Sequence, residues 1–217
     1  MNIHSFYERL DAMTKSENKP HDRTIEIINA SIEAFAEHGY HNTTIQDIVN
    51  KAKFNSVGTI FRYFPRTKNS VKDDILKAIF EEKITLLTES VRQKTSLETT
   101  PLGKIKAFLD HHFEHLKNEE ELAKVLQVEL RQSHHFLQDY DHKKLQDYLK
   151  ILDEAIEQGQ QEGVLKSSIP PKVVRWAIFG AIDEISTTWV LTQRAWPENL
   201  EDISSYIMTM FFDGLKV

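Results

Sequence analysis

The chain has 217 residues, of which 40% are hydrophobic and 10% aromatic, enough apolar material to build a core in one domain or two. It contains no cysteine, which excludes disulfides and thiolate metal sites and fits a cytoplasmic location. Its apolar runs fall short of the ~20 residues that a membrane span needs, and its N-terminus lacks the pattern of a secretory signal, so no membrane partner is expected.

The net charge of −6 is unevenly distributed along the chain. Residues 1–80 carry 11 Lys and Arg and 10 Asp and Glu, whereas residues 81–217 carry 16 and 23. Chance alone can produce this difference. It also fits a protein that contacts nucleic acid with one end only.

Apolar residues recur at three- and four-residue spacing along almost the whole chain, and no two-residue alternation typical of strands is sustained. The sequence therefore predicts an all-α fold. Residues 1–20 lack a consistent apolar face, and we expect a flexible arm there. The first firm helix is predicted to begin near Asp22 and to end at Gly39, with Tyr40 as the hydrophobic contact that follows the helix end.

The segment from Thr43 to Phe64 predicts a helix, a tight turn and a second short helix. Thr43 is the expected N-cap of the first helix, with Gln46 as its capping-box partner. Ser56 is the expected N-cap of the second, which Pro65 ends. This arrangement, over residues 21–69, is typical of a domain that reads the major groove of DNA.

The second short helix should present one face to the core and one to DNA. Ile60 and Phe64 are expected to pack inward, and Thr59, Arg62 and Tyr63 to face the groove. No acidic residue occurs between positions 49 and 72, a stretch that suits phosphate. Its basic residues are Lys51, Lys53, Arg62, Arg66, Lys68 and Lys72.

A long helix is predicted next, over residues 70–94, and can act as a lever between two domains. Residues 70–217 are expected to form the second domain. Its further helices are predicted at Pro101–Lys117, Glu119–Arg131, Tyr140–Gly159, Pro171–Thr192 and Pro197–Leu215. The helix Pro171–Thr192 is apolar over most of its circumference and the last helix has a broad apolar stripe. Together they predict either intramolecular core or the four-helix interface of a homodimer.

The DNA-reading segment resembles the TetR family of bacterial one-component transcriptional regulators. The likeness lies in Thr43–Thr44, Ile48–Val49 and the run Gly58–Phe64, GTIFRYF. It implies an N-terminal three-helix helix-turn-helix domain that binds double-stranded operator DNA. An all-helical ligand-binding and dimerisation domain would follow it.

The rest of the chain is similar to the FadR-type branch of that family, the acyl-CoA-responsive repressors of fatty acid degradation genes. The similar segments are Val128–Ser133, Tyr148–Leu165 and Ile178–Leu191. The resemblance implies a repressor that a long-chain acyl-CoA releases from its operator. A repressor that senses another hydrophobic small molecule, such as a drug or a free fatty acid, is the alternative.

Three departures from the family pattern concern DNA docking and the operator. The turn Lys53–Asn55 is one residue longer than usual and lacks the usual glycine. Phe61 stands where a tyrosine is usual, and the segment Pro65–Leu76 is longer than the family's link.

The resemblance also implies individual DNA contacts. Expected phosphate contacts are Thr44, Thr59, Tyr63 and Lys68. Phosphate contacts do not distinguish bases, so base readout falls to Arg62 and to Ser56 or Val57. Gly58 has no side chain and lets the backbone approach DNA closely. An ordinary exposed residue is the alternative at each position.

Side chains of the middle helices can line a long apolar tunnel for the effector or simply form core. These candidates are Phe108, His112, Phe113, Leu116, Leu122, Leu126, Leu130, Phe136, Tyr148, Leu152, Trp176, Phe179 and Trp189. Asp183 and Glu184 interrupt an apolar helix, and a buried carboxylate there needs a partner such as Arg131. A structural polar network and a role in ligand sensing both account for them.

An enzyme and a protein-binding adaptor are the rival classes. His111 and His115 lie one helical turn apart, but the run HHFEH lacks the order of a zinc protease motif and shows no third ligand. No phosphate-binding loop, nucleophile elbow or cysteine nucleophile occurs. The sequence therefore predicts no catalytic residues, metal or cofactor. An adaptor leaves the run Gly58–Phe64 unexplained.

Overall fold

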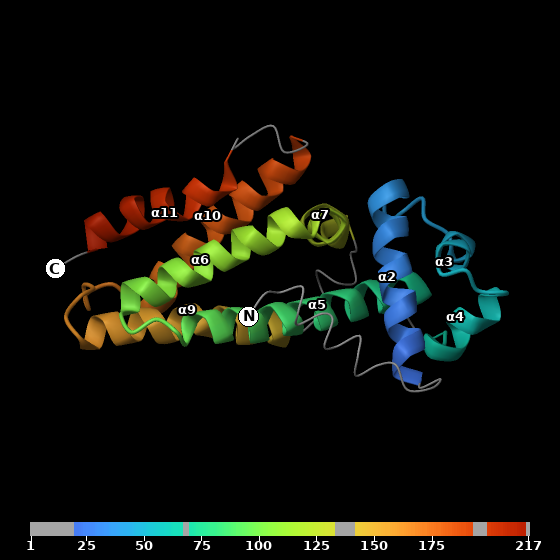
Figure 1. Ribbon diagram of the computed structural model, residues 1–217, viewed down its shortest axis with the longest axis horizontal. Helices are drawn as coiled ribbons and strands as arrows, with labels where there is room; N and C mark the ends of the chain where they lie inside the picture. Colours follow the sequence, from blue (N-terminus) through green and yellow to red (C-terminus); the bar gives the residue numbers. More distant parts are fainter. Residues whose placement is uncertain (1–19, 67–69, 133–141, 193–198, 216–217) are drawn as a thin grey trace. The chain divides into compact units, whose positions relative to one another are not determined.

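A computed structural model describes residues 20–66, 70–132, 142–192 and 199–215. The expected arm over residues 1–20 therefore lies almost wholly outside the described residues, as do Lys68 and Phe136. Most of the described residues are helical and none forms a β-strand, so the all-α prediction is confirmed (Figure 1). None of the described helices is long and apolar enough to cross a membrane.

The chain divides into two compact units, one ending at Leu76 and the other beginning at Lys77. The first contains α2 (Pro20–His38), α3 (Ile45–Lys51), α4 (Val57–Tyr63) and the start of α5 (Val71–Thr95). Helix α5 continues into the second unit. The other elements of that unit are α6 (Pro101–Asn118), α7 (Glu120–Lys124), the π-helical η1 (Val125–Glu129), the 3₁₀ turn η2 (Leu130–Gln132), α9 (Lys143–Gln161), α10 (Pro171–Leu191) and α11 (Leu200–Leu215).

The core of the first unit forms where α2, α3 and α4 meet. Ile48 and Ile60 are fully buried and Phe64 is 8% exposed, so the predicted inward face of α4 is confirmed. Gly39 has a φ of 79°, and its N–H donates to the carbonyl of Phe35 at 2.9 Å. Tyr40 then packs on Phe35 with ring centroids 5.5 Å apart, so the predicted end of this helix is also confirmed.

The start of α3 lies one residue later than predicted. Thr44 is the N-cap, and its capping-box partner is Asp47 rather than Gln46. Thr43 points inward instead, because its buried hydroxyl donates to the carbonyls of Ala34 at 3.1 Å and Gly39 at 2.7 Å. Contact with the preceding helix therefore decides which of two adjacent threonines caps α3.

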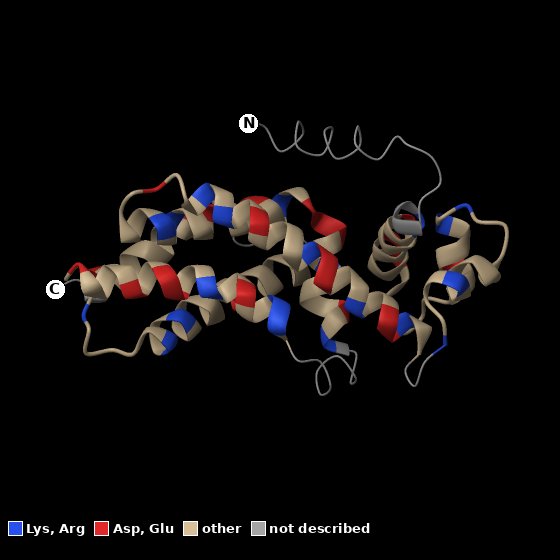
Figure 2. Cartoon of the chain, turned by 90° about the horizontal axis from the view of Figure 1, so that it is seen from below, with Lys and Arg blue, Asp and Glu red and all other residues tan. Residues whose placement is uncertain are grey.

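The second unit is a helical bundle in which α6 packs against α9 and α11, and α10 packs against α9 (Figure 1). Its buried side chains include Phe108, Tyr148 and Ile178. Most helix limits agree with the sequence prediction to within a few residues. The exception is the predicted helix Glu119–Arg131, which passes from α-helix through the π-helical η1 into a 3₁₀ turn. Lysines and arginines are interspersed with acidic residues along the helices of this unit (Figure 2).

Candidate nucleic-acid interface and effector site

Helix α4 and the turn before it border a hollow of about 490 Å³. The residues that line it are Arg23, Lys53, Phe54, Asn55, Ser56, Gly58, Thr59, Arg62 and Tyr63. Five of the eight predicted DNA contacts therefore lie together around one hollow. Its lining contains three cations and no carboxylate. The resulting positive charge suits a DNA phosphate.

The other three predicted contacts do not line this hollow. Val57 is half-buried at the start of α4, and Lys68 lies outside the described residues. Thr44 caps α3, where its hydrogen bonds lower the pKa of the Asp47 carboxyl. Ser56 occupies the N-cap position of α4 as predicted, but its side chain makes no capping hydrogen bond.

Within the predicted basic run, four of the six cations have different roles or lie outside the described residues. Lys51 lies 2.6 Å from a carboxylate oxygen of Glu37, and this contact lowers the pKa of Glu37. The Arg66 guanidinium lies over the Phe61 ring, 4.9 Å from its centroid.

Lys72 is a structural residue rather than a phosphate contact. Its ammonium donates to the carbonyls of Tyr40 at 2.7 Å, His41 at 3.2 Å and Thr43 at 2.9 Å. Burial lowers its pKa, and the Tyr40 hydroxyl also bonds the neighbouring Asp73. The start of α5 is thus fastened to the loop that positions α3.

Sequence reasoning included Lys53 in the basic run but missed Arg23, Phe54 and Asn55 as part of this surface. The Arg23 guanidinium lies 5.4 Å from the centroid of the Phe54 ring and bonds Glu26 at 2.6 Å. The longer turn was the available signal, since it places Lys53, Phe54 and Asn55 beside α4. Nothing in the local sequence of α2 indicates that Arg23 reaches this turn.

In the second unit, most of the predicted effector residues are packed core. Phe108, Phe113, Tyr148 and Leu152 are at most 2% exposed, and Leu130 is 7% exposed. Leu126 and Phe179 keep intermediate exposure. These aromatic and aliphatic side chains give the bundle an apolar interior, and their packing accounts for their positions without a ligand.

His112 is a polar side chain that borders this apolar interior. Its Nδ1 lies 2.8 Å from the Tyr148 hydroxyl, and its Nε2 lies 3.4 Å from the Ser186 hydroxyl. Burial lowers the pKa of His112 to about 3 and raises that of Tyr148, so both side chains are neutral near pH 7. Three helices, α6, α9 and α10, thus meet at one neutral hydrogen-bonded group.

The predicted partnership of Arg131 with Asp183 is confirmed, at a distance of 2.5 Å. Gln127 joins them, since its side-chain oxygen accepts hydrogen bonds from Arg131 and Thr187, each at 3.2 Å. The side chains of Arg131 and Asp183 are 44% and 34% exposed, so the expectation of a buried carboxylate is wrong. Glu184 is exposed.

Trp176 is 54% exposed, so it does not wall an enclosed tunnel within a single chain. It lies on an outer stripe of α10, with its ring centroid 6.1 Å from that of Phe179. The neighbouring Arg175 bonds Asp153 at 2.8 Å and fixes α10 to α9.

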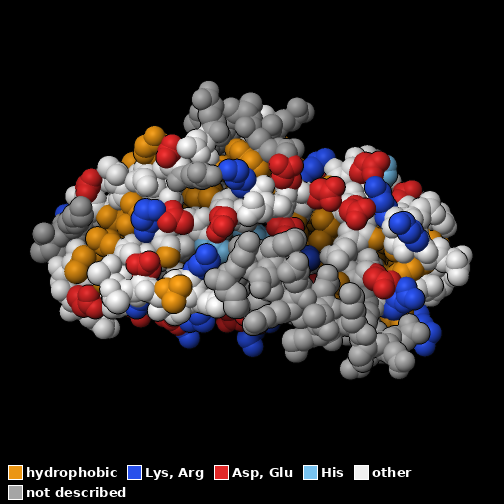
Figure 3. Space-filling view, in the orientation of Figure 1, with side chains coloured by type: hydrophobic (Ala, Val, Ile, Leu, Met, Phe, Trp, Pro, Cys, Tyr) orange, Lys and Arg blue, Asp and Glu red, His pale blue; other side chains and the backbone are white. Residues whose placement is uncertain are grey.

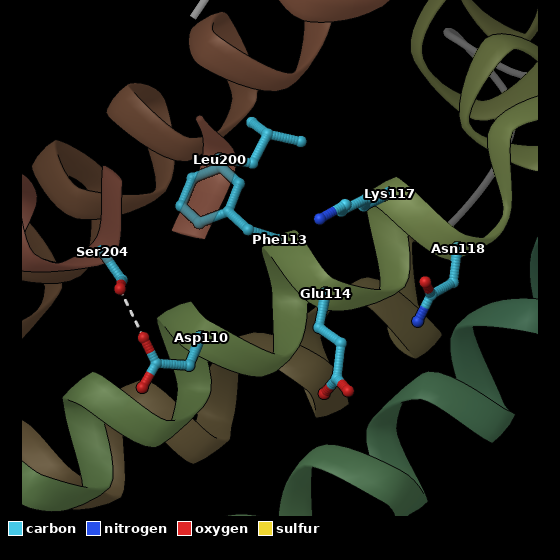
Figure 4. Close-up of a pocket in the computed structure, with 7 residues that line it drawn as sticks. All are labelled: Asp110, Phe113, Glu114, Lys117, Asn118, Leu200 and Ser204. Carbon is cyan, nitrogen blue, oxygen red and sulfur yellow. Dashed lines mark hydrogen bonds between the residues drawn. The ribbon is translucent and has the colours of Figure 1, made fainter. Parts of the chain in front are cut away.

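A hollow of about 360 Å³ lies between α6 and α11 (Figure 4). It is lined by Asp110, Phe113, Glu114, Lys117, Asn118, Leu200 and Ser204. Phe113 points towards Leu200, and Ser204 bonds Asp110 (Figure 4). Phe113 is the one predicted effector residue among them, and the charged lining differs from the expected apolar tunnel.

Of the two histidines considered as metal ligands, His111 has other contacts. The Nε2 of His111 lies 2.6 Å from the Ser90 hydroxyl, and its Nδ1 lies 3.1 Å from Glu114. Burial lowers the pKa of His111, and lowers that of His115 to about 4. Within the described parts of the chain, no three His, Cys, Asp or Glu side chains are grouped to hold a metal ion.

A helix-turn-helix beside a cationic hollow, followed by a separate helical bundle, defines a DNA-binding regulator with a second, all-helical domain. Comparison with known proteins identifies the family of this regulator. Residues 27–79 match the family model of bacterial regulatory proteins of the tetR family, and residues 80–214 match that of the YsiA-like protein C-terminal region. The chain belongs to the TetR family of transcriptional regulators.

Its relatives include regulators of fatty acid metabolism. The fatty acid metabolism regulator protein of Bacillus subtilis (strain 168) is 34% identical over 191 residues, covering 88% of this chain and 94% of that protein. The crystal structure of B. subtilis FadR in complex with stearoyl-CoA has 33% identity and a TM-score of 0.79, covering 88% of this chain and 98% of the other. The fatty acid degradation regulator FadR of Bacillus halodurans has 31% identity and a TM-score of 0.77, with the same coverage.

Proposed function

We propose that this protein is a repressor that binds its operator as a homodimer and that a long-chain acyl-CoA releases from DNA. One observation carries the proposal. The likeness to FadR proteins extends through the second unit, where an effector would bind, instead of stopping at the helix-turn-helix. A relative of this identity has been solved with stearoyl-CoA, which supports the same chemical class of effector here. Such a regulator works in the bacterial cytoplasm.

The proposed operator contacts are the predicted residues around α4. Arg62 is exposed and lines the hollow, and it has no acidic partner among the described residues. It is the proposed base reader, because a guanidinium can bond a guanine edge through two N–H groups. Thr59 and Tyr63, also at the hollow, are the proposed phosphate contacts, and Gly58 permits close approach.

The proposed effector region is the interior of the second unit, between α6, α9 and α10. The apolar side chains there suit an acyl chain. His112, with Tyr148 and Ser186, can offer a neutral hydrogen bond to an oxygen such as the thioester carbonyl. Arg131 is half-exposed and can bind a phosphate of the CoA moiety. Its ion pair with Asp183 would then be replaced by an ion pair with the phosphate.

A homodimer is proposed because a reading unit of this size gains useful affinity by occupying two half-sites. Helix α10 offers a surface for it. Val173, Trp176 and Leu191 are 54–63% exposed along one side of α10. Tyr206 and Met210 of α11 are 59% and 66% exposed. Figure 3 shows hydrophobic side chains in patches at the surface of this unit.

The test is binding of the purified protein to the DNA upstream of its own gene at fixed salt. Fluorescence anisotropy is measured alone and with stearoyl-CoA, free CoA or stearate. Loss of the complex with stearoyl-CoA and not with free CoA is the expected result. By linkage, DNA must weaken acyl-CoA binding by the same factor, a coupling of about 1–3 kcal/mol. Release by stearate alone favours a free fatty acid, and unchanged binding in every arm refutes the proposed effector.

A further inference from the structure

The turn between α3 and α4 holds a lysine in a backbone conformation that favours glycine. Lys53 has a φ of 55°. Its N–H donates to the carbonyl of Asn50 at 3.1 Å, and the N–H of Phe54 donates to that of Val49 at 3.0 Å. This pair of bonds defines a Schellman motif whose left-handed position is Lys53. A residue with a Cβ is strained there, and such strain is concentrated at functional sites.

The Lys53 ammonium is also available to a ligand. Lys53 is exposed, and its side chain makes no ion pair or hydrogen bond with any residue in the described part of the chain. Lys51, two residues earlier, is instead paired with Glu37 at 2.6 Å and lies 4.0 Å from Glu33. Two lysines at the end of one helix therefore differ in whether their charge is balanced within the fold.

Lys53 lines the cationic hollow beside α4, together with Arg23 and Arg62. Arg23 already bonds Glu26, so its charge is partly balanced. The remaining lining adds N–H and O–H donors from Asn55, Ser56, Thr59 and Tyr63. Two unbalanced cations and several neutral donors around one hollow suit a phosphate group of the DNA backbone.

We infer that Lys53 is an additional phosphate-binding residue, which the left-handed turn holds at the hollow so that a backbone phosphate of the operator enters beside the recognition helix. The inference rests on the DNA-binding function proposed above. A phosphate contact carries no base information. Lys53 therefore raises affinity for every sequence alike, in contrast to Arg62.

The test compares the salt dependence of binding for the full-length protein and three variants. Lys53→Gly removes the charge and relieves the strain, Lys53→Arg keeps the charge, and Lys51→Gln is the matched control. Each is measured on the protein's own upstream duplex and on a duplex of scrambled sequence. Urea unfolding is measured in parallel, so that weaker binding can be separated from weaker folding.

Lys53→Gly is expected to unfold at a higher urea concentration than the wild type and yet to bind both duplexes more weakly. The slope of log K against log salt should fall by about 0.9 for each phosphate that the variant no longer neutralises. Lys53→Arg and Lys51→Gln should keep the wild-type slope. An unchanged slope for Lys53→Gly overturns the inference, and so does an equally reduced slope for Lys51→Gln. Failure of the wild type to bind either duplex overturns the proposed DNA-binding function as well.

Discussion

Gly180 provides a direct test of the proposed dimer interface. It lies in the middle of α10, between Trp176 and Leu191 on the exposed stripe. A Cβ added at this position meets no atom of the described residues within 4 Å. Glycine in a helix interior is about 0.8–1.0 kcal/mol less favourable than alanine. Packing among the described residues of one chain therefore does not explain the glycine, whereas close approach of a partner helix does.

Two substitutions separate these explanations. Gly180→Ala should raise the stability of the isolated helix by about 1 kcal/mol, because the single chain has room for the methyl group. Gly180→Leu places four carbon atoms where the partner helix would pack. Overpacking of this kind costs about 1–3 kcal/mol. By the relation of about 1.4 kcal/mol per tenfold change, the dimer dissociation constant should rise about fivefold to a hundredfold.

The dissociation constants are measured by sedimentation velocity over a range of protein concentrations. Far-UV circular dichroism checks that Gly180→Leu remains helical. Leu97→Ser is the control, because Leu97 is 75% exposed but lies outside α10 and α11. Operator affinity should fall with dimerisation in Gly180→Leu and stay unchanged in Leu97→Ser. A Gly180→Leu protein that dimerises as tightly as the wild type would refute the assignment of this stripe to the interface.

Three further predictions concern side-chain contacts within each unit. Lys72→Met leaves the carbonyls of Tyr40, His41 and Thr43 without their donor, and we expect a loss of about 2 kcal/mol in urea unfolding; an unchanged midpoint contradicts the structural role. Stability should fall as pH drops from about 6.5 towards 3, because the partly buried His112 and His115 stay neutral in the folded chain while the unfolded chain takes up protons. The slope is up to about 1.4 kcal/mol per pH unit for each histidine, and His112→Leu should reduce it, as measured by unfolding at several pH values. Arg131→Met should change stability by less than about 1 kcal/mol, since the pair with Asp183 is half-exposed, but should weaken acyl-CoA binding in calorimetry; equal acyl-CoA affinity removes Arg131 from the effector site.

Local signals in the sequence predicted the fold well. Gly39 ends α2 in the expected left-handed conformation, and Pro101 and Pro171 begin helices as expected. The buried face of α4 followed from the spacing of Ile60 and Phe64. These features depend on residues close together in the chain, so periodicity and capping chemistry are enough to find them.

Features that depend on distant contacts were not predictable in the same way. Thr43 and Thr44 have the same capping chemistry, and only the carbonyls of α2 decide between them. Lys72 has the same charge as the other residues of the basic run. Its role in the fold follows from the Tyr40–Thr43 carbonyls, about thirty residues earlier. Trp176 is a large aromatic residue of the kind expected in a core, yet its side chain is 54% exposed on the outside of α10.

The long helix α5 is bonded near both ends, which bears on how an effector can act. Near its start, Lys72 and Asp73 hold it to the loop that positions α3. Further along, Ser90 bonds His111 of α6 and Arg92 bonds Glu154 of α9. His111 is adjacent to His112, the proposed polar contact of the effector. A ligand that displaces α6 at His112 would therefore disturb the Ser90 contact of α5. Helix α5 is continuous from Val71 to Thr95, and its first residues belong to the DNA-reading unit. A shift of α5 near Ser90 can therefore be transmitted along the helix to that unit.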